Sequence, residues 1–246
     1  MKEPDTTCSP LRIVSGRIAS KIYRKKESDD LKRIDEIEKQ AVPLRDALDL
    51  FPPGSADKIA SWEEDFVKVQ EKLAGDVSFV STADVSLTWL QYILTRALKP
   101  QIVVETGVWI GSSSFSLLSA LSANGHGKLI SIDFPPFWKK NRVGIGRLVP
   151  ESLYKYWELH LGPSQALLST VAKPGSLDLF IHDSDHTYCN MMAEFEAAWE
   201  LVRPGGYLVS DDSSMNDSVL DFAESKGCAY KFLKREKGGT IAIMIR

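Results

Sequence analysis

From about residue 100 onward, short apolar runs alternate with stretches of helical character. The runs are rich in β-branched and aromatic residues, and several are too continuously apolar to have a face in water. They are QIVVET (101–106), KLISID (128–133), YWELHL (156–161), LDLFIH (177–182) and GYLVSD (206–211). Helical segments between them include 112–123, 164–172 and 188–202. Strands that are buried on both sides and alternate with helices predict a parallel sheet with helices on both faces.

The end of the chain departs from this alternation. AYKFLK (229–234) and TIAIMIR (240–246) are separated by a short segment that contains EKGG, a pattern typical of two antiparallel strands joined by a tight turn. We therefore expect an α/β fold, a Rossmann-like doubly wound sheet of seven strands closed by a terminal antiparallel hairpin.

The first 80 residues differ from the rest in composition and in the spacing of their apolar residues. They are charged, and apolar residues recur at helical intervals, for example Trp62, Phe66, Val69 and Leu73. This predicts a helical N-terminal extension (1–80) that covers a domain at 81–246, with residues 81–100 as a helix that leads into the first strand. Residues 11–26 are basic and contain no acid. They are either a face for an anionic membrane or polymeric partner, or half of a solvated helix pair with complementary charges, and we favour the second interpretation.

Composition excludes several classes of function. The formal net charge is −3, and without a basic surplus we expect no nucleic-acid partner. The three cysteines are widely spaced and form no CxxC pair, so neither a disulfide framework nor a zinc ribbon is indicated. No apolar run approaches the roughly 20 residues of a transmembrane helix. We expect a cytoplasmic protein.

The first strand ends in a glycine turn, VVETGVWIGSSSFSLL (103–118). Gly107 and Gly111 allow a ligand to approach the backbone, and Ser112 to Ser114 can cap the next helix. The spacing is E-x-G-x-x-x-G, which differs from the G-x-G-x-x-G of dinucleotide-binding proteins. An NAD-dependent oxidoreductase is therefore disfavoured, and no phosphate-binding P-loop follows.

An acid closes the second strand. Asp133 lies 26 residues after Gly107, where a carboxylate can accept hydrogen bonds from two ribose hydroxyls. The glycine turn and this acid together favour a ligand that carries a nucleoside.

With these features the chain resembles the class I S-adenosylmethionine-dependent methyltransferases. The turn ETGVWIG is similar to their first motif, Asp133 to their ribose acid, LVRPGGYLVSDD to the segment around their fifth strand, and the hairpin to their reversed last strand. The resemblance implies S-adenosylmethionine as cofactor. The cofactor-binding residues that we expect are Glu105 and Gly107 near the methionine end, Gly111, Ser112, Asp133 at the ribose, Ser164 with Gln165 near the adenine, and Asp183.

Three aspartates follow neighbouring strands. Asp183 comes directly after the fourth predicted strand, and Asp211 and Asp212 close the fifth. The carboxyl ends of adjacent parallel strands lie side by side, so these carboxylates can converge on one cation. Oxygen ligands suit Mg²⁺ or Ca²⁺ more than zinc. The alternative is that each aspartate only caps a helix or turn.

The same positions resemble divalent-metal-dependent O-methyltransferases of the catechol type and of the type that modifies macrolide and aminocoumarin sugars. That resemblance implies Asp183, Asp211 and Asp212 as metal ligands and Asp185 as general base. The stretch from His182 to Asn216 is also similar to bacterial methyltransferases often found with glycan biosynthesis.

Two histidines flank these acids and leave the identity of the base open. His182 ends an apolar strand, where a structural role is the commoner one. His186 stands beside Asp185 and can orient it or act as the base itself.

The connection after the second strand, residues 134–157, is long and mixes aromatic and basic residues. Phe137 and Trp138 either stack on an acceptor within a lid or pack against the N-terminal helices.

The combined expectation is an S-adenosylmethionine-dependent O-methyltransferase. It moves a methyl group to a hydroxyl of a small-molecule or glycan acceptor with the help of Mg²⁺ or another divalent cation. The rival hypotheses are a metal-independent methyltransferase and a regulatory protein that binds the cofactor without catalysis.

Overall fold

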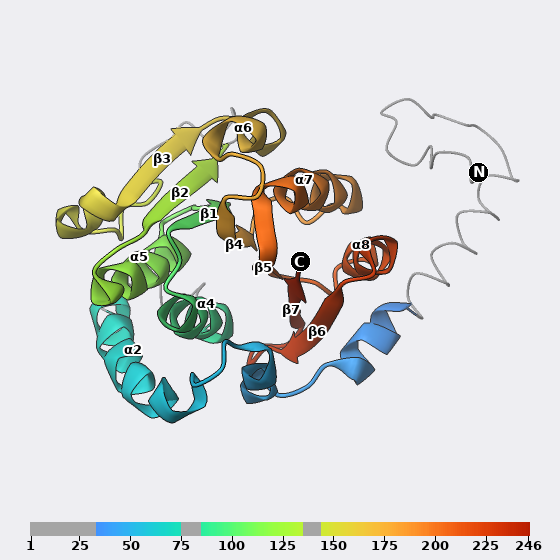
Figure 1. The fold of residues 1–246 in the computed structure, drawn as a ribbon, viewed down its shortest axis with the longest axis horizontal. Helices are drawn as coiled ribbons and strands as arrows, with labels where there is room; N and C mark the ends of the chain where they lie inside the picture. Colours follow the sequence, from blue (N-terminus) through green and yellow to red (C-terminus); the bar gives the residue numbers. More distant parts are fainter. Residues whose placement is uncertain (1–32, 75–84, 135–143) are drawn as a thin grey trace, which may run out of the picture.

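The structure is a computed structural model, and it describes residues 33–74, 85–134 and 144–246. Within these residues seven strands form one sheet in the order β3-β2-β1-β4-β5-β7-β6 (Figure 1). The strands are β1 (Ile102–Thr106), β2 (Lys128–Asp133), β3 (Trp157–Leu161), β4 (Leu177–His182), β5 (Val202–Ser210), β6 (Ala229–Lys234) and β7 (Thr240–Ile245). β1 to β5 pair in parallel, and β7 runs antiparallel to both β5 and β6. The predicted α/β fold with its terminal hairpin is confirmed.

Helices cover both faces of the sheet, as expected for strands without a face in water. α2 (Ile59–Ala74), α4 (Val85–Leu98) and α5 (Ser112–Asn124) lie on one face, and α6 (Ser164–Val171), α7 (Tyr188–Leu201) and α8 (Ser218–Lys226) on the other (Figure 1). Three short 3-10 helices are also present among the described residues: η2 (Leu44–Leu50), η3 (Ala56–Lys58) and η4 (Glu151–Tyr156). The strand order reverses between β1 and β4, which is where ligands bind in open α/β sheets.

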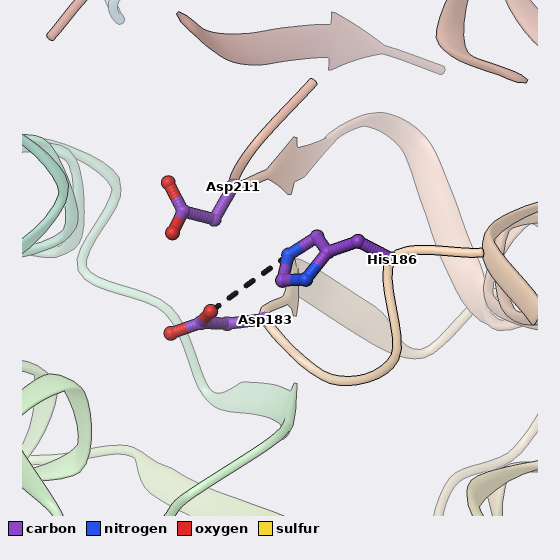
Figure 2. Close-up of side chains that lie close together, drawn as sticks. All are labelled: Asp183, His186 and Asp211. Atoms are coloured by element: carbon purple, nitrogen blue, oxygen red, sulfur yellow. Dashed lines mark ion pairs between the residues drawn. The ribbon is translucent and has the colours of Figure 1, made fainter. Parts of the chain in front are cut away.

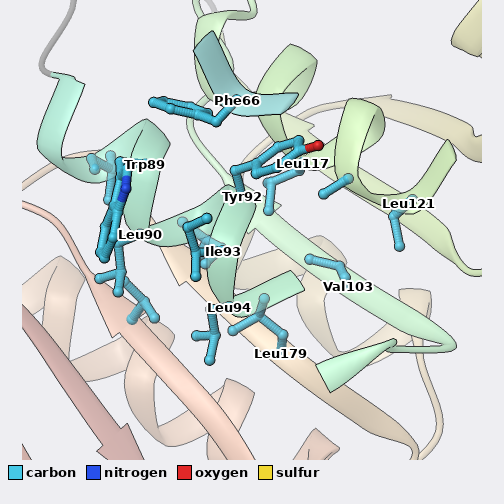
Figure 3. Close-up of a cluster of buried hydrophobic side chains, with 14 of the residues drawn as sticks. Phe66, Trp89, Leu90, Tyr92, Ile93, Leu94, Val103, Leu117, Leu121 and Leu179 are labelled. Atoms are coloured by element: carbon cyan, nitrogen blue, oxygen red, sulfur yellow. The ribbon is translucent and has the colours of Figure 1, made fainter. Parts of the chain in front are cut away.

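The helical extension packs into the core of the sheet domain. Trp62, Phe66, Val69 and Leu73 are buried on one face of α2, as the helical spacing predicts. The Phe66 ring lies 5.5 Å from that of Tyr92 on α4, and α4 in turn packs with β1 and β4 in one hydrophobic cluster (Figure 3). The division of the chain near residue 80 stays a prediction, but the two segments share this core.

Residues before η2 protect an edge of the sheet. The backbone N–H of Val42 donates to Phe232 O at 3.0 Å, and Lys234 N–H donates to Val42 O at 2.8 Å. Residues 33–40 form a helix nearby, in which Arg33 contacts Asp217 and Asp221, each at 2.9 Å. The outermost strand β6 is therefore partly paired rather than open.

Strand β5 begins four residues earlier than expected, at Val202 instead of residue 206. Val202 pairs with Leu177, and a register irregularity then precedes the Leu179–Tyr207 pair. Gly205, with φ of 72°, lies in the intervening segment. The sequence pattern missed this start because Pro and Gly are normally read as strand breakers.

The basic stretch 11–26 and the aromatic residues Phe137 and Trp138 lie outside the described residues. Among the described helices, none combines the length and apolar character needed to cross a membrane.

Candidate functional site

A cavity of about 480 Å³ opens at the carboxyl ends of the central strands. It lies between the glycine turn after β1, the end of β2, the loop before α6 and the loop after β4. Its lining residues are Gly107, Val108, Trp109, Ser112, Ser113, Ile132, Asp133, Phe134, Gly162, Pro163, Ser164, Gln165, Asp183, Ser184, Asp185 and Asn190. Seven of the residues predicted from the sequence to act at the site are therefore at this cavity: Gly107, Ser112, Asp133, Ser164, Gln165, Asp183 and Asp185.

The two glycines of the turn are required by close backbone packing. Gly107 has φ of 88°, and a Cβ atom there would lie 1.8 Å from the carbonyl oxygen of Asp183. Gly111 has φ of 92°, and a Cβ there would lie 2.8 Å from Gly146 Cα. Gly111 is not among the residues that line the cavity. Its place in the structure is explained by contact with the chain around Gly146 rather than by contact with the cavity.

Glu105 is fully buried below the turn rather than at the cavity wall. Its carboxylate accepts hydrogen bonds from Ser113 and Ser131, each at 2.6 Å, and from Ser114. Burial raises the pKa of Glu105 above its usual value, although the three serine hydroxyls act in the opposite direction. The expectation that Ser112 to Ser114 cap α5 is wrong: Gly111 is the N-cap residue, no side chain caps the helix, and two of these serines bind Glu105 instead.

Asp133 holds the glycine turn in place. Its Oδ2 accepts hydrogen bonds from the backbone N–H groups of Val108 and Trp109, both at 2.8 Å. Trp109 has a positive φ of 44°, a conformation that costs energy for a residue with a side chain. Its ring is exposed at the cavity together with Phe134. The acid at the end of β2 therefore fixes the strained turn that forms the cavity wall.

The side chains of Asp183, His186 and Asp211 lie together and offer a set of metal-ligating atoms (Figure 2). One ligand atom from each lies within 4.8 Å of the others, and His186 Nε2 is 3.9 Å from Asp183 Oδ1. The pKa of Asp183 is raised well above its usual value. The main cause is burial, and the negative charges of Asp211, Glu105 and Asp212 add to it. Burial, followed by the proximity of His182, lowers the pKa of His186. A cation bound between these side chains would offset the repulsion between the two carboxylates, and a neutral imidazole can act as a further ligand.

Asp212, the third predicted ligand, is placed differently. It adopts a positive φ of 45° and makes an ion pair with Arg235. Arg235 Nη1 also lies 3.4 Å from Asp211 Oδ1. The structure thus brings Asp183 and Asp211 together with His186, and it places an arginine beside Asp211 and Asp212.

Sequence reasoning did not identify Arg235, although the topology contained a signal. β7 runs antiparallel to β5, so the turn that precedes β7 returns to the carboxyl end of β5. A cation in the turn of a terminal hairpin is therefore a candidate neighbour for acids that close β5.

Asp185 is exposed at the cavity wall. Its Oδ1 accepts a hydrogen bond of 3.1 Å from Thr187 N–H, so it also shapes the turn that begins α7. The neighbouring His186 is held from below, because Asn216 Nδ2 donates to the His186 carbonyl oxygen at 2.9 Å.

Glu194 on α7 is a buried acid that the sequence reading missed. Its carboxylate interacts with His182 Nδ1 at 2.7 Å and accepts hydrogen bonds from Thr106 and Ser164 among others. Burial alone would raise the pKa of Glu194, but His182 and the hydroxyl donors lower it to about 2. A signal was present, because Glu194 lies three residues after Met191 and one before Phe195 on the apolar stripe of the helix. His182 is fully buried, in agreement with a structural role for its ring.

Comparison with known proteins places the chain among methyltransferase folds. Residues 104–213 match a family model described as a methyltransferase domain, a segment that contains both the glycine turn and the Asp211–Asp212 pair. No protein with a curated description matches the chain in sequence.

Solved structures with the same fold include several O-methyltransferases. The O-methyltransferase TomG from Streptomyces achromogenes, involved in tomaymycin synthesis and solved in complex with S-adenosylmethionine, is 20% identical with a TM-score of 0.55, covering 85% of this chain and 98% of its own. A putative O-methyltransferase from Klebsiella pneumoniae is 16% identical with a TM-score of 0.56, covering 72% and 88%. An O-methyltransferase from Bacillus cereus, solved with S-adenosylhomocysteine, is 18% identical with a TM-score of 0.50, covering 85% and 100%. These similarities establish the fold. The domain match adds that residues 104–213 are similar to a methyltransferase domain.

Proposed function

We propose that the protein transfers a methyl group from S-adenosylmethionine to a hydroxyl of a small-molecule or glycan acceptor, with a divalent cation at the acceptor. The observation that carries this proposal is the cavity at the strand ends. Its wall combines the glycine turn and Asp133, which the sequence associates with a nucleoside ligand, with residues 162–165, where the resemblance to methyltransferases implies contact with the adenine. Its position at the reversal of strand order supports the same assignment.

Different residues of the cavity bind different parts of S-adenosylmethionine, the methyl donor. Asp133 uses Oδ2 to hold the turn, and its other oxygen is assigned to the ribose hydroxyls. Ser164 and Gln165 border the adenine, and Gly107 the methionine end. S-adenosylmethionine, when bound, supplies a methyl group that is already activated on a sulfonium. The contribution of the chain is then to position an acceptor hydroxyl in line with that methyl group, which is where most of the rate gain originates.

The donor set formed by Asp183, His186 and Asp211 fits a divalent cation. His186 Nε2 is buried and makes no hydrogen bond. A buried polar atom normally has a partner, and a metal ion would be one for this nitrogen. A divalent cation bound by these three residues would lower the pKa of an acceptor hydroxyl and orient it. Asp212, which pairs with Arg235, lies outside this set. Asp185, exposed at the same wall, accepts the proton of the hydroxyl at its carboxylate.

Calorimetric titration with S-adenosylhomocysteine and with NAD tests the cofactor assignment. We expect binding of S-adenosylhomocysteine only, and about 10- to 100-fold weaker binding in Asp133→Asn, because a charged hydrogen-bond acceptor for the ribose is lost. Asp178→Asn is the matched control. Asp178 also accepts two backbone N–H groups, from Gln101 and Ile102, but at the amino end of β1. Preferential binding of NAD contradicts the proposal.

A metal-independent methyltransferase is the second candidate, and Arg235 is the observation in its favour. The guanidinium contacts Asp212 and lies near Asp211, so the chain already supplies a positive charge at this position. Titration of a turnover assay with EDTA separates the two. The metal-dependent proposal expects activity to disappear and to return with excess Mg²⁺ or Mn²⁺, and activity that persists in EDTA overturns it.

A further inference from the structure

Glu194 collects hydrogen bonds from four separate segments of the chain. On its Oε2 side are Thr106 Oγ1 at 2.6 Å, from the end of β1, and His182 Nδ1 at 2.7 Å, from the end of β4. On its Oε1 side are the hydroxyls of Ser164 and Ser184 and the amide of Asn190, the last two at 2.8 and 3.2 Å. The carboxylate is fully buried. An ionised carboxylate in the interior with both oxygens satisfied fixes the geometry of everything that donates to it.

Three of these donors form part of the cavity wall. Ser164, Ser184 and Asn190 line the cavity, whereas Glu194 and Thr106 do not. Ser164 is the first residue of α6, and Ser184 comes from the loop after β4. Asn190 also donates to the carbonyl of Asp185 at 2.8 Å. One buried side chain behind the wall therefore sets the separation of two segments that must enclose the same ligand.

Another of these contacts, the one with His182, links Glu194 to the ring of His186. Because the Glu194 carboxylate can only accept, His182 donates its Nδ1–H, which fixes the orientation of the ring. The His182 ring then packs edge to face against the rings of His186, at 5.2 Å, and Phe195, at 5.4 Å. The position of the His186 ring thus depends on a neighbour that Glu194 holds.

We propose that Glu194 is a positioning residue that holds one wall of the cofactor cavity and the His182–His186 ring pair in a single arrangement. This inference rests on the proposed function, since it takes the cavity to be the cofactor site. Glu194 touches neither the cavity nor any reacting atom. It acts through Ser164, Ser184, Asn190 and His182.

The test compares Glu194→Gln with Glu196→Gln in calorimetric titrations with S-adenosylhomocysteine. Glu196 is on the same helix, two residues away, and is exposed and paired with Lys226. Glutamine keeps the shape of the side chain but can accept at only one of its two terminal atoms. We therefore expect Glu194→Gln to bind S-adenosylhomocysteine at least about 10-fold more weakly than the wild type, and Glu196→Gln to bind it with unchanged affinity. Equal affinity of folded Glu194→Gln and wild type overturns the inference. Failure of the wild type to bind S-adenosylhomocysteine overturns the proposed function itself.

A second variant and a spectroscopic measurement guard against a simple folding defect. Thr106→Val removes one donor to Glu194 without changing the shape of the side chain or the cavity lining, and we expect about 2- to 10-fold weaker binding. The imidazole ¹⁵N signals of the chain's four histidines report on the rings directly. Those of both His182 and His186 are expected to shift in Glu194→Gln while those of His126 and His160 stay in place. An unchanged His186 signal in a folded variant overturns the link between Glu194 and the ring pair.

Discussion

At the scale of single residues, Gly107 has the most demanding position in the site. It combines a positive φ of 88° with a Cβ position 1.8 Å from the Asp183 carbonyl oxygen. A side chain there would have to displace the segment that carries Asp183 and, two residues later, Asp185. The glycine is therefore needed for close contact between the turn after β1 and the loop after β4, in addition to its conformational freedom.

Gly107→Ala and Gly125→Ala separate these two effects. Gly125 also has a positive φ, 79°, but nothing lies within 4 Å of its Cβ position. We expect Gly125→Ala to lower the free energy of unfolding by about 1–2 kcal/mol, the cost of left-handed backbone alone. Gly107→Ala should cost about 1–3 kcal/mol more because of the overlap. Urea unfolding measures both values, and equal losses would mean that the backbone around Asp183 moves aside freely.

At the scale of elements, the chain before η2 completes the sheet at β6. Among the residues that the structure describes, Val42 forms this bridge, through a donor and an acceptor on its own backbone. The bridge covers part of an edge that would otherwise present unpaired N–H and C=O groups. It also ties the N-terminal helical segment to the hairpin whose turn carries Arg235.

Val42→Pro tests this bridge, with Val42→Ala as control. Proline removes the N–H that donates to Phe232 O, whereas alanine keeps both backbone hydrogen bonds. We expect Val42→Pro to lower the free energy of unfolding by about 1 kcal/mol or more beyond Val42→Ala. The amide proton of Lys234, which donates to Val42 O, should also exchange faster with solvent. Unchanged exchange at Lys234 would show that this edge is protected by other contacts.

At the scale of the whole molecule, buried acids with opposite pKa shifts determine how stability depends on pH. The pKa of Glu194 is lowered to about 2 from 4.5, so its ionised form stabilises the fold above the unfolded pKa. That contribution is lost as pH falls from about 4.5 to 2. Burial raises the pKa values of Glu105 and Asp183. Their ionisation therefore destabilises the fold as pH rises above their usual values.

A comparison of wild type with Glu194→Gln isolates the first of these contributions. Denaturant unfolding at about pH 5 and about pH 3 should show the stability difference between the two proteins narrowing by about 2 kcal/mol at the lower pH. The sign follows from the lowered pKa, because protonation of Glu194 makes the wild type resemble the variant. The same stability difference between the two proteins at both pH values would mean that Glu194 is not held ionised in the fold.

Much of the architecture follows from the sequence alone. The runs of β-branched and aromatic residues around Val103, Leu129 and Phe180 predicted the central strands because strands covered on both faces must be apolar along their whole length. Asp183 and Asp211 were expected to lie close together for a related reason, and the structure places them so. Parallel strands end at the same edge of a sheet, so acids that follow them meet whatever the details of packing.

The tertiary structure decided the pairings between distant side chains. Asp212 contacts Arg235 rather than the cluster of Asp183, His186 and Asp211, the serines of the turn bind Glu105 rather than the helix end, and Glu194 joins four segments behind the cavity wall. Local periodicity determines which face of an element is buried. It contains no information on which polar group a buried side chain will meet across the core, because that depends on how helices and sheet pack and which donors then lie within hydrogen-bond distance.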